Sequence, residues 1–207
     1  MPLSLLRPCA LSLVLAALAA CNARVAPSAA ATAAAPEIGC VPGERGYLHL
    51  KLRGAIDAEP NWRGAQLQCE GGARPNGRGL RVSFLGPAEA DGARIRLVFG
   101  IATGPGLGAS RSVPTNITVI VEGRKQLYAT QGDDKCQIES MLQEPLAPTS
   151  AAARAASMRP YRIAARGYCI DPASSLDGSG RLYIDRFDFS GLARFAENEL
   201  YASIPRH

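Results

Sequence analysis

Histidine, cysteine and carboxylate side chains build most catalytic and metal sites, and histidine is scarce in this chain of 207 residues. The two histidines are His49 and the last residue, His207, so a metal site made of several imidazoles is excluded. His49 lies among Lys51 and Arg53 on the polar side of an alternating segment, which favours a solvated side chain over a general base. We therefore predict no catalytic residues, no bound metal and no cofactor, and we expect that the protein is not an enzyme.

Some glycine and aspartate segments match functional motifs only superficially. Residues 104–108 are rich in glycine, but residues 110–114 do not begin the helix that a phosphate-binding loop requires behind it. We interpret residues 104–108 as part of a long mobile hairpin connection. Neither this region nor residues 177–180 match the GxSxG spacing of a nucleophile elbow. Asp171 and Asp177 could supply oxygen ligands to calcium, although their spacing fits no calcium loop and turn formation explains them equally well.

Arginine dominates the basic residues, since only three of the 23 are lysine, and the formal net charge is +5. Outward positions of the alternating segments hold Lys51, Arg53, Arg81, Arg94 and Arg96. If their strands are neighbours, these residues form one basic face that suits anionic lipid headgroups, lipopolysaccharide phosphates or acidic glycans. A merely solvated face is the alternative. Trp62, the only tryptophan, is either a sugar-stacking platform or an anchor in the core or a loop. No aromatic residues interleave with the basic ones, so nucleic acid is not an expected partner.

The elements that position these residues are short strands. Apolar residues alternate with polar ones along several segments, most clearly residues 48–53, 80–84, 95–99 and 117–121. Glycine and proline clusters separate these segments, and no long amphipathic helix lies between them. We predict an all-β fold, an antiparallel β-sandwich of about seven to nine strands with long Gly/Pro-rich loops, in preference to a barrel.

The C-terminal part of the chain departs from simple alternation in two places. Along residues 182–189 the inward-facing apolar residues change parity, which predicts a β-bulge near residues 185–186. The apolar spacing of Leu192, Phe195, Ala196 and Leu200 allows a short closing helix.

Four of the six cysteines lie in the part of the chain with strand-like alternation. They are Cys40, Cys69, Cys136 and Cys169. An even number of cysteines in an exported chain indicates two disulfides, and we favour pairing between sequence neighbours among the three connectivities. A zinc site is the rival interpretation, but no pair has CxxC spacing.

The N-terminal segment has the pattern of a secretory signal. One basic residue, Arg7, precedes an apolar run at residues 10–20, which is too short for a stable membrane span. The run ends Leu18-Ala19-Ala20-Cys21, which resembles the lipobox of bacterial lipoproteins, an aliphatic residue, two small residues and a cysteine. The resemblance implies cleavage before Cys21, attachment of a diacylglyceryl group to its thiol and acylation of its new amino group. An ordinary secretory signal, with Cys21 as half of a disulfide, is the alternative.

The same resemblance gives the expected organisation of the chain. Two or three acyl chains hold a protein on a membrane essentially permanently. Asn22 replaces the aspartate that favours inner-membrane retention in the enterobacterial pattern, which points to the outer membrane. We expect a signal peptide at residues 1–20, a lipidated Ala/Pro-rich tether at residues 21–36 and a single β-rich domain at residues 37–207.

Three functional hypotheses follow. The first is a lipid-anchored envelope lipoprotein that acts as a structural, accessory or binding module, with the membrane as its partner and an envelope protein or acidic glycan as a second one. The second is a β-sandwich that binds glycan or lipopolysaccharide. The third is an envelope hydrolase whose site the sequence does not reveal.

Overall fold

A computed structural model describes residues 40–148 and 157–202 of the chain. The predicted signal peptide, the tether and Cys21 lie outside these residues. None of the helices within the described ranges has the length and apolar character needed to cross a membrane.

The described residues form an all-β fold, as predicted, with eleven strands, one 3-10 helix and one short α-helix. The elements are β1 (Tyr47–Gly54), β2 (Asn61–Arg63), η1 (Gly64–Gln66), β3 (Gln68–Ala73), β4 (Leu80–Ala88), β5 (Arg94–Ile101), β6 (Ala109–Glu122), β7 (Gln126–Ala129), β8 (Cys136–Pro145), β9 (Met158–Cys169), β10 (Ala173–Ser175), β11 (Arg181–Ala196) and α2 (Glu197–Ala202). The strand number exceeds the expected seven to nine because β2 and β10 have three residues each, too few to show alternation in the sequence.

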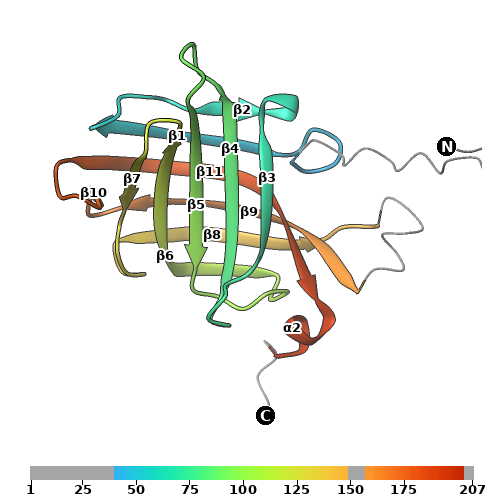
Figure 1. The fold of residues 1–207 in the computed structure, drawn as a ribbon. Helices are drawn as coiled ribbons and strands as arrows, with labels where there is room; N and C mark the ends of the chain where they lie inside the picture. Colours follow the sequence, from blue (N-terminus) through green and yellow to red (C-terminus); the bar gives the residue numbers. More distant parts are fainter. Residues whose placement is uncertain (1–39, 149–156, 203–207) are drawn as a thin grey trace, which may run out of the picture. The chain divides into compact units, whose positions relative to one another are not determined.

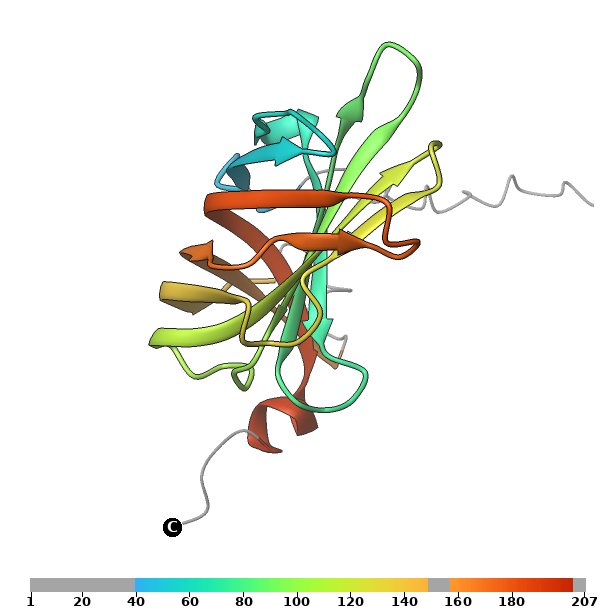
Figure 2. The ribbon, with the colours of Figure 1, turned by 90° about the vertical axis from the view of Figure 1, so that its left-hand side faces the viewer.

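The eleven strands belong to one continuous sheet, which folds into two layers (Figures 1 and 2). Strand β10 is one link between the layers, because it pairs with both β11 and β7. We call β3, β4, β5, β7 and the second half of β6 the front layer, and β2, β1, β11, β9, β8 and the first half of β6 the back layer. Figure 1 shows the front strands running across the back ones. The 14-residue strand β6 belongs to both layers, since Ala109–Thr115 pairs with β8 and Thr115–Glu122 pairs with β5. Long strands that pass between sheets make the corners of such sandwiches.

The core between the layers is aromatic. Phe84 and Phe99 from the front layer meet Phe187 and Phe189 from β11, and all four are almost fully buried. The ring centroids of Phe99 and Phe189 lie 4.5 Å apart, and those of Phe84 and Phe189 lie 5.2 Å apart. Each such pair contributes roughly 0.5–1.5 kcal/mol beyond the burial of its apolar area.

The predicted bulge on β11 is confirmed by the pairing with β1. Leu50 pairs with Phe187 but Leu52 pairs with Ile184, so β11 has one extra residue at this point. The extra residue turns both Ile184 and Phe187 inward, which strict alternation would forbid.

The predicted closing helix exists but begins later than expected. Residues 192–196 continue β11, because this strand stays paired with β9 as far as the partners Ala196 and Met158. Helix α2 begins at Glu197, directly after that pairing ends, and the amide of Ala196 donates a hydrogen bond of 2.7 Å to a carboxylate oxygen of Glu199. Of the four apolar residues assigned to the helix, only Leu200 lies in it.

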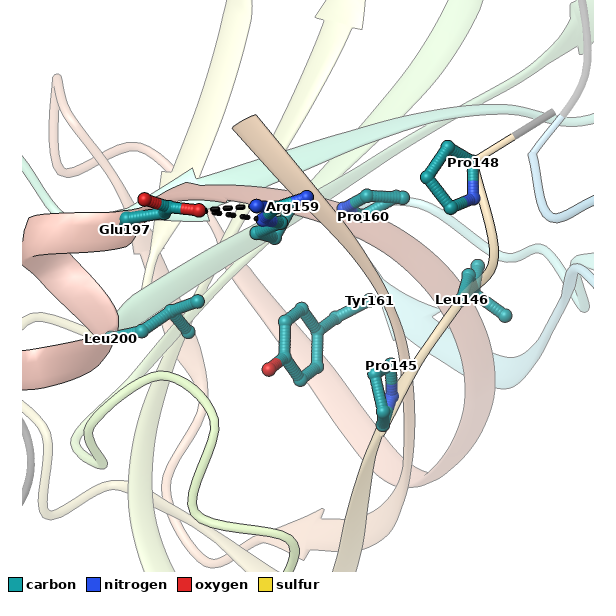
Figure 3. A pocket seen from close by; sticks show the side chains of 8 residues that line it. All are labelled: Pro145, Leu146, Pro148, Arg159, Pro160, Tyr161, Glu197 and Leu200. Carbon is teal, nitrogen blue, oxygen red and sulfur yellow. Dashed lines mark hydrogen bonds and ion pairs between the residues drawn. The ribbon is translucent and has the colours of Figure 1, made fainter. Parts of the chain in front are cut away.

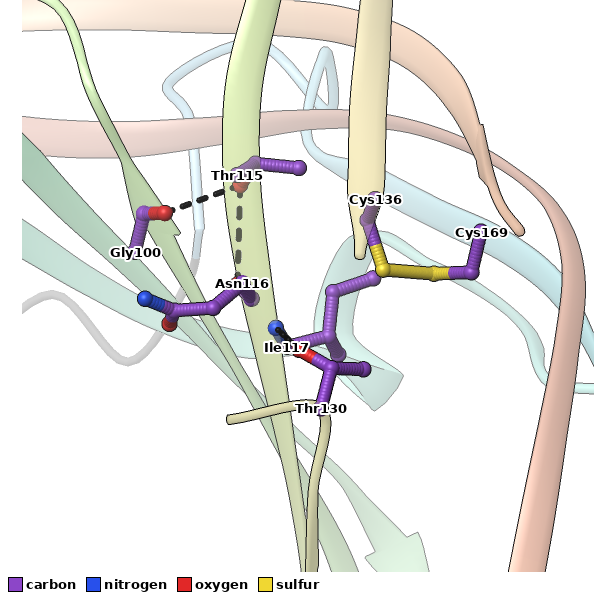
Figure 4. Close-up of a disulfide and its surroundings, with 7 residues drawn as sticks. All are labelled: Gly100, Thr115, Asn116, Ile117, Thr130, Cys136 and Cys169. Carbon is purple, nitrogen blue, oxygen red and sulfur yellow. Dashed lines mark hydrogen bonds between the residues drawn. A yellow bond between two sulfur atoms is a disulfide. The ribbon is translucent and has the colours of Figure 1, made fainter. Parts of the chain in front are cut away.

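The two disulfides have the predicted sequential pairing. Cys40 is bonded to Cys69, at the place where β3 approaches β11, and the Leu192 amide donates a hydrogen bond of 3.1 Å to the Cys69 sulfur. A Cβ atom on Gly71 would lie 2.9 Å from the Leu192 carbonyl oxygen, so the close contact of the layers here needs glycine. Cys136 and Cys169 are direct partners on β8 and β9, and their disulfide lies beside Thr115 and Ile117 of β6 in Figure 4.

Candidate functional site

The predicted basic face is divided between the two layers. Arg81, Arg94 and Arg96 lie on the paired strands β4 and β5, whereas Lys51 and Arg53 lie on β1, whose partners are β2 and β11. The five residues therefore do not form the single face that neighbouring strands would have given. The prediction of a single basic face was wrong because alternation shows which face of a strand a residue occupies but does not show which strands are neighbours.

Most of these arginines are engaged within the fold. The Arg96 Nε donates to Glu122 at 2.7 Å, and its Nη1 donates to the Ser83 hydroxyl at 3.3 Å. The Arg94 Nε donates to the carbonyl oxygen of Gly86 at 2.9 Å. Arg53 forms an ion pair of 3.1 Å with Asp185. Arg81 is exposed and has no such contact within the described parts of the chain.

Trp62 lies half-buried on β2 and packs against the core. Its indole lies directly over Gly86, where an added Cβ would come within 2.3 Å of the ring. Gly86 thus covers one face of the ring. The geometry favours the interpretation of Trp62 as an anchor.

A pocket of about 340 Å³ opens beside helix α2 (Figure 3). Its lining comes from the end of β8 and the residues after it, from the start of β9, and from α2. The lining residues are Pro145, Leu146, Pro148, Arg159, Pro160, Tyr161, Glu197 and Leu200. A concave site of this size, mostly apolar with a few polar groups, is the usual form of a small-ligand site.

Three prolines line this pocket near the end of the pairing between β8 and β9. Pro145 pairs with Tyr161 at the end of β8, and the Leu146 amide donates to the Pro160 carbonyl at 2.9 Å. Pro148 has no amide hydrogen, so it cannot donate to a further ladder bond. Beneath the pocket, the ring of Tyr161 makes an edge contact with Phe195 at 5.6 Å, which fixes its orientation.

The loop at residues 104–108 is tied down next to the pocket. Gln143 is 3% exposed, and its side-chain amide donates to the Gly104 carbonyl at 2.9 Å while its oxygen accepts from the Gly106 amide at 2.8 Å. A Cβ on Gly106 would lie 3.7 Å from the Tyr161 hydroxyl oxygen and 3.0 Å from Leu200. The loop that we interpreted as a mobile connection is thus held against the pocket, and Gln143 was the residue that sequence reasoning missed.

The charged groups of the pocket form one ion pair. Arg159 and Glu197 are joined by two hydrogen bonds, one of them 3.0 Å long from the Arg159 Nε. Both side chains are about half exposed. Such a surface pair contributes only about 0–1 kcal/mol, so its hydrogen-bonding groups can exchange partners at low cost. The pocket combines the ring of an aromatic residue, proline rings and an ion pair whose net charge is zero. These groups suit a ligand with an uncharged ring that carries hydroxyl groups.

The acidic residues considered for calcium have local partners. Asp177 accepts hydrogen bonds from the Ser179 hydroxyl at 2.7 Å and the Ser179 amide at 3.0 Å, which lower the pKa of Asp177 to about 2. Asp171 forms an ion pair of 3.0 Å with Lys135. Across the described ranges, no group of three or more His, Cys, Asp or Glu residues could hold a metal ion.

A second polar cluster fastens the loop between β7 and β8. Asp133 accepts two hydrogen bonds from Arg74, at 3.0 and 3.1 Å, and one of 2.6 Å from the Asn116 side chain. The Arg74 guanidinium holds the pKa of the Asp133 carboxyl below its usual value. Nearby, in Figure 4, the Thr115 hydroxyl donates to the Gly100 carbonyl at 2.9 Å. This cluster links three segments of the front layer and acts in stability.

Fold and site together define a disulfide-bonded, all-β, two-layer domain with a small pocket at one corner. No protein-family model matches the chain, and no curated protein or solved structure matches it.

Proposed function

We propose that this chain is a lipoprotein of the bacterial envelope, whose domain acts by binding rather than by catalysis. One observation carries the proposal: two disulfides join all four cysteines of an all-β domain that follows the segment Leu18-Ala19-Ala20-Cys21. Disulfides persist in oxidising compartments such as the periplasm, where lipoproteins fold. The mature chain would begin at Cys21, and the Ala/Pro-rich residues up to 36 would tether the domain to the outer membrane.

The lipid anchor can be tested by processing and fractionation. Each buried CH₂ group contributes about 0.8 kcal/mol, so two or three acyl chains keep the wild-type chain in the membrane fraction. The substitution Cys21→Ala removes the acylated thiol, and we expect an unprocessed precursor. Cys9→Ala is the matched control, because Cys9 lies in the discarded segment and should leave processing unchanged. Globomycin, which blocks lipoprotein signal cleavage, should reproduce the precursor. If Cys21→Ala and globomycin leave processing and membrane fractionation unchanged, the proposal of anchoring is wrong.

A second candidate function, binding of a neutral or weakly polar sugar ring, is favoured by the pocket at Tyr161. Its fixed aromatic ring lies near the Arg159–Glu197 pair, which offers both donors and acceptors to hydroxyl groups. We expect soluble peptidoglycan fragments to bind the wild-type chain, and Tyr161→Ala to weaken binding at least tenfold. Tyr161→Phe keeps the ring and should retain most of the affinity. Tyr183→Ala, at an exposed tyrosine on β11, is the control. Equal binding by Tyr161→Ala and wild type would remove this candidate.

A further inference from the structure

Three arginines lie close together on the outward face of the back layer. Arg166 on β9 is the direct partner of Ser140 on β8, and Ser140 is in turn the partner of Arg111 on β6. Arg186 on β11 is the partner of Tyr168, two residues along β9 from Arg166. Neighbouring strands are about 4.8 Å apart, so the three backbone positions fall within about 10 Å of Arg166. We call Arg111, Arg166 and Arg186 the arginine patch.

All three side chains of the arginine patch are exposed, and within residues 40–148 and 157–202 none has an ion pair or hydrogen bond. A carboxylate lies directly beside the patch. Asp188, the direct partner of Arg166, accepts a hydrogen bond of 2.7 Å from the Tyr47 hydroxyl. Burial, with Asp188 beside it, raises the pKa of Tyr47 to about 12, so this hydroxyl keeps its proton.

Two further carboxylates lie on the neighbouring strand β8. Glu144 is bound to Arg162 at 2.7 Å, so it does not neutralise the patch. Glu139, at the irregularity between Ile138 and Ser140, is exposed and has no ion pair in the described ranges. A hydrogen bond from the neutral Tyr47 hydroxyl leaves the charge of Asp188 in place, so Asp188 and Glu139 oppose the three arginines, and the patch keeps a small excess of positive charge.

Like charges at neighbouring sheet positions repel one another, and the repulsion is relieved when an anion binds between them. Guanidinium groups bind phosphate with paired hydrogen bonds, and they do so best on a rigid support. Strand β9 is such a support, since it is paired with β11 on one side and with β8 on the other. Leu142 of β8, 42% exposed and partnered with Ala109 and Ala164, adds an apolar side chain near the patch.

From this arrangement we infer that the arginine patch is a docking surface for the phosphate headgroups of an anionic membrane. Complementary charge on a paired sheet, with an exposed leucine near it, suits binding to such a surface. The inference goes beyond the proposed anchor, because the patch acts through the folded domain and needs no acyl chain.

The test measures binding of the full chain carrying Cys21→Ser, so that no acyl group contributes. Vesicles of phosphatidylcholine alone are compared with vesicles that also contain phosphatidylglycerol, and the neutral vesicles report what the rest of the chain contributes. We expect tighter binding to the anionic vesicles and a loss of that gain at high salt. The variant R111Q/R166Q/R186Q should lose about a hundredfold in affinity for anionic vesicles, since each basic residue near such a surface contributes about fivefold.

The matched control is R78Q/R81Q/R181Q, which removes the same charge from exposed arginines outside the patch. We expect it to lose much less than the patch variant. Glu139→Gln removes one of the two opposing charges and should tighten binding about fivefold by the same increment. Equal losses in the two triple variants, or a loss in the patch variant that is the same on neutral and on anionic vesicles, would overturn the inference. If the patch variant does not fold, unchanged binding by Glu139→Gln overturns it as well.

Discussion

The arginine patch on the back layer differs from a group of paired arginines on the front layer. On the front layer, Arg96 is bonded to Glu122, and Arg124 at the turn after β6 reaches both Glu89 and Asp91 at 2.7 Å. On the back layer, the arginine patch has no such partner among the described residues. Arginines that are ion-paired within the sheet stabilise it, whereas arginines without a partner are available to bind another molecule. The net charge of +5 would not distinguish these two roles.

The largest expected effect comes from separating the layers. Replacing Cys40 and Cys69 together by serine removes the disulfide at the contact of β3 and β11, and we expect a loss of about 3 kcal/mol in the free energy of unfolding. The control, Cys136→Ser with Cys169→Ser, removes a bond within the back layer and should cost a similar amount. Hydrogen exchange distinguishes them, since only the first pair should speed exchange in both β3 and β11. Faster exchange confined to one layer would contradict this role of Cys40–Cys69.

Trp62 gives the next largest effect, because it joins the edge of the back layer to Gly86 of the front layer. Trp62→Ala should lower the free energy of unfolding by about 2 kcal/mol, less than for a fully buried aromatic residue. Trp62→Phe should recover part of this loss. Urea denaturation measures both. Retention on peptidoglycan at a temperature where the variant is folded should not change, and a selective loss of retention would restore the sugar-platform interpretation.

The ion pair between Arg74 and Asp133 in the front layer can be tested by measuring how protein stability depends on pH. Asp133→Asn should lower the free energy of unfolding by about 1 kcal/mol at pH 7. The loss is modest because solvent partly screens the hydrogen bonds between Arg74 and Asp133. Because Arg74 lowers the pKa of the folded Asp133 from 3.8, the carboxylate stabilises the fold above that pH. This contribution is lost as the pH falls through the folded pKa. In thermal unfolding, the wild type should therefore have a higher melting temperature than the variant at pH 7, and this difference in melting temperature should shrink towards pH 2. A difference that stays constant with pH would exclude the carboxylate charge as its cause.

The smallest expected effects on stability come from single arginine substitutions, one on the front layer and one in the arginine patch. Arg96→Gln should lower the free energy of unfolding by about 0.5–1 kcal/mol, because Glu122 and the Ser83 hydroxyl lose a partner. Arg166→Gln should change it by less than about 0.5 kcal/mol, as expected for an exposed side chain without contacts. Chemical denaturation of both single variants measures the difference. Equal losses would mean that the patch also serves stability.

Local patterns in the sequence predicted the strands and the bulge on β11, because both depend on alternation. The disulfide pairing was favoured only as the simplest of three connectivities, and the structure has that pairing. The pocket and the arginine patch depend on which distant strands become neighbours. Arg111, Arg166 and Arg186 meet only through pairings among β6, β8, β9 and β11, and no local pattern specifies those pairings. Around Arg166 the sequence Ala164-Ala165-Arg166-Gly167 has little apolar contrast, so this part of β9 was not recognisable as a strand face. The strong alternation of β4 and β5 drew attention to Arg81, Arg94 and Arg96 instead.

The bond between Cys40 and Cys69 has a mechanical consequence for a domain that is held from its N-terminal side. A pull on the chain before Cys40 enters the fold through a covalent bond to β3. Without that bond, the force would act first on β1 and could peel it from β11 one hydrogen bond at a time. With it, the load passes into the front layer through β3, which is paired with β4 along its whole length. Strand β1 then carries only part of a load that is applied on the N-terminal side of Cys40.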